Sequence, residues 1–144
     1  MIGGRVLAVD LGDVRIGLAL SDPSATVATP LTTLTVDDAD DLDAIAASIT
    51  EVARDRQADT VVVGLPRALS GREGHAAQRA RAVADRVREH GLVVALWDER
   101  FTTVEAERAM LAQDASRRER RQALDRVAAT LLLQAYLDHA RRGV

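Results

Sequence analysis

Apolar residues in the first third of the chain fall in three short runs separated by turn residues. Residues 5–10 and 15–21 flank a turn that contains glycine, and a third run over about 28–36 is interrupted by Pro30. This pattern predicts three strands joined by short turns. Because proline has no N–H to donate to a neighbouring strand, the third strand suits the edge of a sheet.

The rest of the chain alternates amphipathic segments with continuous apolar runs, which is typical of helices packed on parallel strands. Residues 60–64 read Thr-Val-Val-Val-Gly and residues 93–97 form a similar run, so we expect both to be buried strands. Helices are expected over about 40–56, up to about 90 after a loop over 65–74, in a short segment capped by Thr102 and Glu105, and from about 118 to 141. The first of these helices should bury one face that consists of Leu42, Ile45, Ala46, Ile49 and Val52.

This order of elements predicts an α/β fold with a mixed five-stranded sheet, in which three antiparallel strands precede two parallel strands and helices flank the sheet. The length of 144 residues and the hydrophobic content of 47% suit a single core. We therefore expect residues 1–144 to form one domain.

Composition removes several classes of function. The chain contains no Cys, which excludes disulfides, thiolate metal sites and a cysteine nucleophile. One Phe, one Trp and one Tyr argue against recognition by stacking on several nucleobases. The three histidines, His75, His90 and His139, lack metal-ligand spacing and are expected at the surface. No signal-peptide pattern or membrane-length apolar run is found, so we expect a cytoplasmic protein.

Charge is distributed unevenly along the chain. Residues 1–64 carry a net charge of −7 and residues 65–144 carry +4, so the overall charge of −3 does not exclude a nucleic-acid partner. All 19 basic residues are arginine. Arginine suits bidentate binding of phosphate, although a genome-wide bias toward arginine would explain the same composition.

Acidic residues and a glycine stand where the predicted strands end. Asp10 ends the first strand, Gly64 ends a central strand, and Asp98 and Glu99 follow the last strand. Ligands gather beyond the carboxyl ends of parallel strands, so these residues should share one edge of the sheet. Asp10 alone would fit a simple hairpin turn equally well, and it is the further acids that favour a ligand site.

Asp125 supplies another acid from the last predicted helix. Steps of 100° per residue place it on the same stripe as Ala128, Ala129, Leu132 and Tyr136. An unpaired carboxylate is costly to bury there, so either a cation or an arginine must neutralise it. Arg121, one turn earlier, could form an intrahelical ion pair, and this alternative stays open.

Four segments, in this order, resemble the YqgF family, also called RuvX: Ala8-Val-Asp-Leu-Gly12 with Arg15-Ile-Gly17, Val62-Val-Gly-Leu-Pro66 with Ser70-Gly71, Asp98-Glu-Arg-Phe-Thr-Thr103 with Glu105-Ala106, and Leu124-Asp-Arg-Val-Ala-Ala129. The resemblance spans nearly the whole chain. It implies a ribonuclease H-like fold, and an activity as a Holliday junction resolvase or as a nuclease that matures the 5′ end of the 16S rRNA precursor. It also implies that Asp10, Glu99 and Asp125 are the catalytic metal ligands.

The implied chemistry needs these residue types. Hydrolysis of a phosphodiester requires an activated water and a stabilised leaving alkoxide, and Mg²⁺ or Mn²⁺ can supply both. Hard cations prefer oxygen ligands, which fits three carboxylates without a cluster of His or Cys. We expect Asp10 to bridge two ions, with Glu99 and Asp125 each completing one shell. Ala128 stands where related resolvases often carry a fourth acid, so one ion and two ions both remain open.

Nucleic-acid contacts are predicted around these acids. Arginines that could hold the phosphate backbone, or could simply be solvated, are Arg15, Arg67, Arg100 and Arg126. Hydrogen bonds to phosphate could come from Ser70, Gly71, Thr102 and Thr103, which turn formation and helix capping also explain. The sharpest basic cluster comprises Arg117, Arg118, Arg120 and Arg121. Many family members carry a lysine here, so phosphate contacts would come from arginine. We interpret the cluster as a mobile arm that becomes ordered on nucleic acid, the alternative being a solvated helix start.

The leading prediction is a nuclease that depends on a divalent metal and acts on structured or single-stranded RNA in ribosome biogenesis. A resolvase of branched DNA is the alternative, and it would act as a homodimer because symmetric cutting needs two active sites. A non-catalytic module for ribosome assembly would bind nucleic acid without cleaving it. Asp10-Leu-Gly12 also resembles the first phosphate loop of sugar kinases, actin and chaperone ATPases, but those proteins close ATP between two domains and 144 residues supply one.

Overall fold

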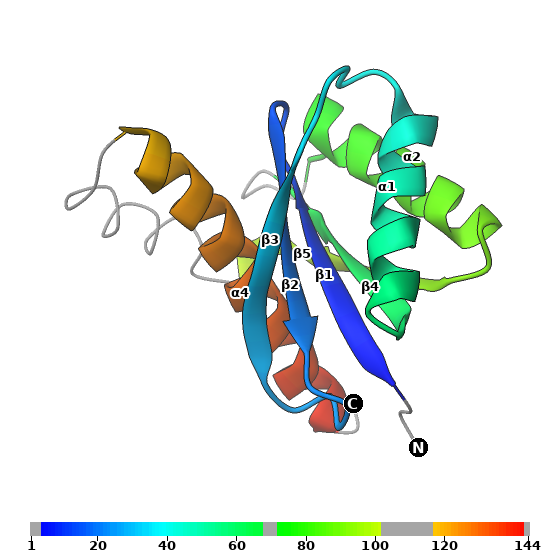
Figure 1. Cartoon of the computed structure of the whole chain (residues 1–144), viewed down its shortest axis with the longest axis vertical. Helices are drawn as coiled ribbons and strands as arrows, with labels where there is room; N and C mark the ends of the chain where they lie inside the picture. The colour runs from blue at the N-terminus through cyan, green and yellow to red at the C-terminus, as the bar shows by residue number, and fades with distance from the viewer. Residues whose placement is uncertain (1–3, 68–71, 102–116, 143–144) are drawn as a thin grey trace.

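A five-stranded sheet with helices on both faces forms the protein, as a computed structural model describes it (Figure 1). The structure describes residues 4–67, 72–101 and 117–142, and the side chains of residues 101 and 117–126 are not among those described. The strands are β1 (Arg5–Leu11), β2 (Arg15–Ser21), β3 (Ala28–Thr35), β4 (Ala58–Leu65) and β5 (Val93–Asp98). The helices are α1 (Leu42–Asp55), α2 (His75–Glu89), the single 3₁₀ turn η1 (Glu99–Phe101) and α4 (Arg117–Arg141).

The sheet is mixed, as the sequence predicts. Its strand order is β3-β2-β1-β4-β5, with β1, β2 and β3 antiparallel and β4 and β5 parallel to β1. The strand that contains Pro30 lies at an edge, which confirms the inference from that proline. The register against β2 shifts there, because Leu18 pairs with Thr32 while Ala19 pairs with Pro30. The shift lets the edge strand accommodate a residue that cannot donate to the ladder.

Two apolar layers hold the helices to the sheet. In Figure 1, α1 and α2 cover one face of the sheet and α4 covers the other. The alternation of side chains along β1 serves both layers: Leu7 and Val9 belong to the core under α1 and α2, while Val6 and Ala8 belong to the core under α4. Any polar side chain on β1 is therefore assigned to one helical layer by its position in the strand.

Helix α1 follows the predicted amphipathic pattern. Ile45, Ala46 and Ile49 are buried, and Leu42 and Val52 pack against the same core. The carboxylate of Asp41 caps the helix by accepting a hydrogen bond from the backbone N–H of Ala44 at 3.2 Å.

Two expectations about the C-terminal half need correction or refinement. The apolar run over residues 93–97 predicts a buried strand, and this is wrong: β5 is an edge strand whose residues are all at least partly exposed, with Val93 64% exposed. An apolar run cannot distinguish a central strand from an edge strand that helices cover in part.

The basic cluster lies in the first turns of α4, so its backbone is that of a helix start. Its predicted contact with nucleic acid stays a prediction.

The predicted short helix capped by Thr102 and Glu105 lies outside the described residues. The turn η1, over Glu99–Phe101, was not predicted. Of the helices that the structure describes, none is both long and apolar enough to cross a membrane.

Candidate active site

Asp10 lies on the face of the sheet that α4 covers. It follows Val6 and Ala8 in the alternation of β1, and those two side chains pack in the core under α4. Asp10 is 8% exposed, which makes it one of the few buried polar residues among those described. Its cross-strand partner on β2 is Gly17, which has no side chain to fill the space beside the carboxylate. A buried carboxylate in such a place needs neighbours that compensate its charge.

Gly64 makes room for the carboxylate of Glu99. A Cβ atom added at Gly64 would lie 2.6 Å from Glu99 Oε1 and 2.5 Å from Leu132 Cδ1 on α4, closer than real Cβ contacts come. Any side chain at position 64 would therefore force both the carboxylate of Glu99 and the side chain of Leu132 to move. This close approach explains the glycine near the end of β4, and its φ angle plays no part.

The strand register brings Asp10 to the same place. Val9 of β1 pairs with Val63 of β4, so Asp10 and Gly64 are the next residues on neighbouring parallel strands, which lie about 4.8 Å apart. Gly64 in turn pairs with Trp97, two residues before Glu99. Gly64 thus lies between the two carboxylates, on the face that α4 covers. The structure places Asp10, Gly64 and Glu99 together, as the positions of the strand ends predict.

Helix α4 passes over this point with Leu132 against Gly64. The backbone of Asp125 lies in the same helix two turns earlier, about 10.5 Å along its axis. The stripe predicted to follow Asp125 is confirmed, because Ala128, Ala129 and Leu132 are buried and Tyr136 packs against the same core. The side chain of Asp125 lies outside the described ones. Within the described part of the chain, no three His, Cys, Asp or Glu side chains form a group that could hold a metal ion.

Asp98 precedes Glu99 but faces a different set of groups. Its carboxylate accepts hydrogen bonds from Arg100, with Nη2 at 2.6 Å from Oδ2, and from Arg67 Nη1 at 3.3 Å. The hydrogen bond from Arg100, followed by the backbone N–H of the same residue and by Arg67, lowers the pKa of Asp98 from 3.8 to about 2. Asp98 is therefore an anchored anion that fixes the turn into Glu99.

A second carboxylate extends this network to the start of α2. Glu73 accepts two hydrogen bonds from Arg81, at 2.7 and 2.6 Å, and pairs with Arg67 at 3.2 Å. The bond from Arg81 lowers the pKa of Glu73. Arg67 thus bridges Asp98 and Glu73, which ties the end of β4 both to β5 and to α2.

The oxygen-only character of Asp10 and Glu99 fits a hard divalent cation. The missing side chain of Gly64 is the second observation in favour, since it leaves room for the carboxylate of Glu99, beside the methyl group of Leu132. Carboxylates suited to a divalent cation are therefore present near the carboxyl end of β1 and directly after β5.

Comparisons with known proteins identify the family of this chain. Residues 4–139 match the family model described as "RuvX: Holliday junction resolvase". The chain belongs to the RuvX family. Similar members are proteins named "Putative pre-16S rRNA nuclease": one from Moorella thermoacetica is 45% identical over 93% of this chain and 94% of its own. One from Pelotomaculum thermopropionicum is 44% identical over 93% of this chain and 86% of its own. The family resemblance noted from the motifs is thereby confirmed, and these names support a nuclease.

The fold of this RuvX family member is also that of a solved resolvase. The structure of Thermus thermophilus RuvC in complex with a Holliday junction substrate superposes with a TM-score of 0.62 and 18% identity, covering 97% of this chain and 96% of that one. A second structure of Thermus thermophilus RuvC superposes with a TM-score of 0.57. The prediction of a ribonuclease H-like fold is confirmed.

Other predicted site residues of this RuvX family member have mixed outcomes. Arg15 is half-buried at the start of β2, where its carbonyl accepts a hydrogen bond from Gly12 N–H at 2.9 Å and closes the turn after Asp10. Arg67 and Arg100 are paired with acids as described above. Predicted groups that lie outside the described residues or side chains are Ser70, Gly71, Thr102, Thr103, Arg117, Arg118, Arg120, Arg121 and Arg126. Their contacts with nucleic acid stay predictions.

Arg79 is a site residue that sequence reasoning missed. It lies on α2, is 9% exposed, and donates from Nε to the carbonyl of Ala39 and from Nη1 to the carbonyl of Gly12, both at 3.1 Å. The second bond holds the turn two residues after Asp10. Its signal in the sequence is an arginine one turn before Val83 on the buried face of an amphipathic helix, where a charge needs a specific partner.

Proposed function

We propose that this chain is a single nuclease domain over residues 1–144 that hydrolyses phosphodiester bonds of RNA with the help of Mg²⁺ or Mn²⁺. The observation that supports the proposal is the carboxylate of Glu99 against Gly64, where any other residue would push it away, with Asp10 on the neighbouring strand β1. Asp125 would supply the third carboxylate from α4. One ion or two, when bound, would activate the attacking water and stabilise the leaving alkoxide.

The residues of the chain have separate parts in this proposal. Asp10 and Glu99 would hold the cation from the sheet, and burial of Asp10 would keep competing water away. Arg79 and the anchored Asp98 would act as positioning residues, because they fix the turns that follow Asp10 and precede Glu99. Arg15, Arg67 and Arg100 would meet phosphates at the rim, in exchange for part of their present ion pairs.

The proposed substrate is the 5′ end of the 16S rRNA precursor, and the protein would then act in the cytoplasm. This substrate comes from the names of relatives that are 40–45% identical over 93% of the chain. Branched DNA is the second candidate, because the family model itself is described as a Holliday junction resolvase. Cutting such a junction symmetrically would require a homodimer.

The test uses purified protein with two labelled substrates, a fragment spanning the 5′ end of pre-16S rRNA and a four-way DNA junction. With Mg²⁺ or Mn²⁺ we expect cleavage of the RNA at defined positions. Ca²⁺, which takes longer bonds and looser geometry, should allow binding without turnover. Cleavage that persists in excess chelator would contradict a metal mechanism. Binding without cleavage under every condition would instead identify a non-catalytic assembly module.

A further inference from the structure

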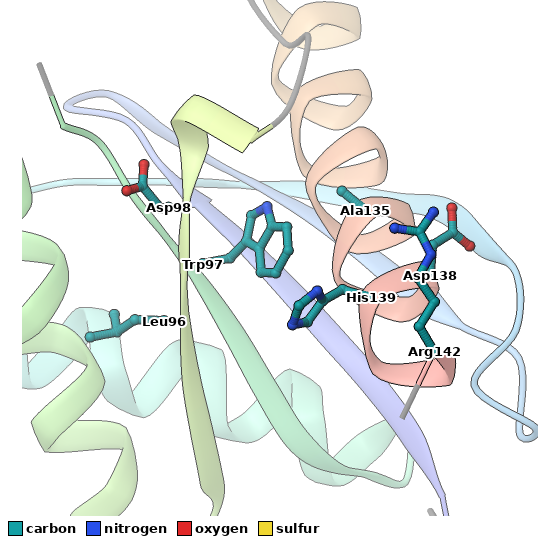
Figure 2. Close-up of a pocket in the computed structure, with 7 residues that line it drawn as sticks. All are labelled: Leu96, Trp97, Asp98, Ala135, Asp138, His139 and Arg142. Carbon is teal, nitrogen blue, oxygen red and sulfur yellow. The ribbon is translucent and has the colours of Figure 1, made fainter. Parts of the chain in front are cut away.

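A cavity of about 690 Å³ lies between the edge strand β5 and the C-terminal half of α4. Its walls include Trp97 from the strand and Ala135, Asp138, His139 and Arg142 from the helix and its end. Figure 2 shows the indole of Trp97 and the imidazole of His139 pointing toward each other across the space between β5 and α4, with Asp138 and Arg142 together on the side of α4 away from Trp97. The volume is within the range of ordinary small-ligand sites.

Aromatic residues are scarce in this chain, yet they gather at this cavity. Trp97 is the only tryptophan and Tyr136 the only tyrosine of the chain. The ring of Tyr136 meets the indole edge-on at a centroid distance of 6.1 Å, and the ring of His139 lies tilted against it at 5.4 Å. Tyr136 supports the indole from the core side, while Trp97 and His139 line the cavity. The planes of these two rings are inclined at 59°, so a flat ligand can stack on one ring and meet the other with its edge.

The polar groups of the cavity complement the donors and acceptors of a nucleobase. Asp138 accepts hydrogen bonds at Oδ1 from Gln134 Nε2 at 3.0 Å and from Arg141 Nη2 at 2.6 Å, and these bonds lower its pKa, so it remains an anionic acceptor. Arg142 lines the same space as a donor and a cation. A base needs both kinds of group along its edge, and the adjacent phosphate needs the cation.

The cavity opens beside the candidate active site. Trp97 pairs with Gly64 across the sheet, and Glu99 follows two residues later with its carboxylate against that same glycine. From these observations we propose that the β5–α4 cavity binds one unstacked nucleobase, which stacks on the ring of His139 and meets the indole of Trp97 with its edge, next to the bond that is cut. This inference rests on the proposed nuclease function. It narrows the substrate to a nucleic acid that is single-stranded at the base next to the cleaved bond. A base inside a duplex could not enter.

The single tryptophan permits a direct test. Because Trp97 is the only tryptophan, intrinsic tryptophan fluorescence of the full chain reports on this cavity alone. The protein is titrated, in excess chelator so that no turnover occurs, with a single-stranded RNA octamer and with an abasic octamer of equal phosphate number. We expect the RNA octamer to quench the emission and the abasic octamer to leave it nearly unchanged.

A pair of variants tests the stacking contact. His139→Ala should weaken binding of the RNA octamer about tenfold, as expected for the loss of one base–aromatic stack. The matched control is His90→Ala, an exposed histidine at the end of α2 on the other helical layer, which should bind as the unchanged protein does. Equal melting temperatures of the two variants, and an unchanged emission maximum without RNA, show that the cavity wall is intact.

Three results would overturn the proposal: quenching by the abasic octamer equal to that by RNA, no quenching by either, or equal affinities of the His139→Ala and His90→Ala proteins. Because the titration contains no metal, it is independent of catalysis. Quenching in a protein that fails to cleave would contradict the nuclease and keep the base-binding cavity. Cleavage without quenching would support the nuclease and contradict the base-binding cavity.

Discussion

Asp98 and Glu99 are neighbours in the sequence but have different surroundings, because the chain leaves β5 between them. Side chains alternate along β5, so Ala95 and Trp97 lie in the layer of α4 while Asp98 lies on the opposite side. There its carboxylate accepts hydrogen bonds from Arg67 and Arg100. The turn η1 then returns Glu99 to the face of Asp10. The two acids therefore separate into an anchor and a candidate ligand.

Asp98→Asn should destabilise the protein at neutral pH and much less in acid. The folded-state pKa of about 2 is lower than the ordinary 3.8, so the ionised form contributes stability above about pH 4 and loses it as the pH falls toward 2. The expected loss at pH 7 is on the order of 1–2 kcal/mol, allowing for solvent screening. Urea unfolding of both proteins at pH 7 and pH 3 measures the difference, and a gap that widens in acid would refute the assignment.

Gly64→Ala should damage activity more than stability. The new methyl group would meet Glu99 Oε1 and Leu132 Cδ1, so both the carboxylate and the leucine side chain must move. Overpacking of this kind costs about 1–3 kcal/mol, which urea unfolding can measure, while nuclease activity should fall by far more than the folded fraction. Gly74→Ala is the control, because a Cβ there meets nothing within 4 Å. Full activity of the Gly64→Ala protein would show that Glu99 does not act from this position.

At the level of elements, α4 has two functions. Its buried stripe covers the sheet, and its earlier turns contain Asp125, the proposed third ligand. Gln134 fixes the helix against the start of β3: its Oε1 accepts from Ala28 N–H at 2.9 Å, and its Nε2 donates to the carbonyl of Thr26 at 3.0 Å. The position of Asp125 therefore depends on contacts more than two turns away along the helix.

Gln134→Met should lower the free energy of unfolding by about 1–3 kcal/mol, because it leaves the backbone groups of Thr26 and Ala28 without these partners while keeping the side-chain volume similar. Chemical denaturation measures the loss. Gln78→Met, at an exposed position on α2, is the matched control and should change stability little. Equal stabilities of the two variants would mean that α4 is held by its apolar stripe alone.

The basic cluster at the start of α4 should act through charge. Changing Arg117, Arg118, Arg120 and Arg121 together to Ala should weaken binding of different sequences about equally, since phosphate contacts carry no sequence information. Each lost contact removes about 0.9 from the slope of log K against log salt on duplex DNA and about 0.7 on single strands, so four would change it by roughly 3 units. A salt titration by fluorescence anisotropy measures this slope. An unchanged slope with normal affinity would leave the cluster as a solvated helix start.

For the whole molecule, the sequence predicts most of the framework because strand ends, apolar runs and helix stripes are local signals. The sheet edge at Pro30, the pairing of the strands that carry Asp10 and Gly64, and the stripe of α4 were all predicted in this way and are confirmed. What escaped prediction depends on residues far apart in the chain. The burial of Arg79 has a local signal, but its partner Gly12 lies 67 positions away and has none. The partial exposure of β5 follows from its place at the edge of the sheet, which an apolar run does not reveal.

The central claim is that carboxylates of the sheet hold the catalytic cation, and Asp10 is its most direct test. The measurement is the rate of RNA cleavage in Mn²⁺ by Asp10→Asn, beside Asp13→Asn as a control that changes an exposed aspartate in the same turn. Glu99→Gln and Asp125→Asn extend the comparison to the other two acids. We predict that Asp10→Asn abolishes cleavage while its metal-free fold melts no lower, because one of three mutually repelling anions has been removed, and that Asp13→Asn cleaves normally. Cleavage by the Asp10→Asn protein at the rate of the Asp13→Asn protein would contradict the account.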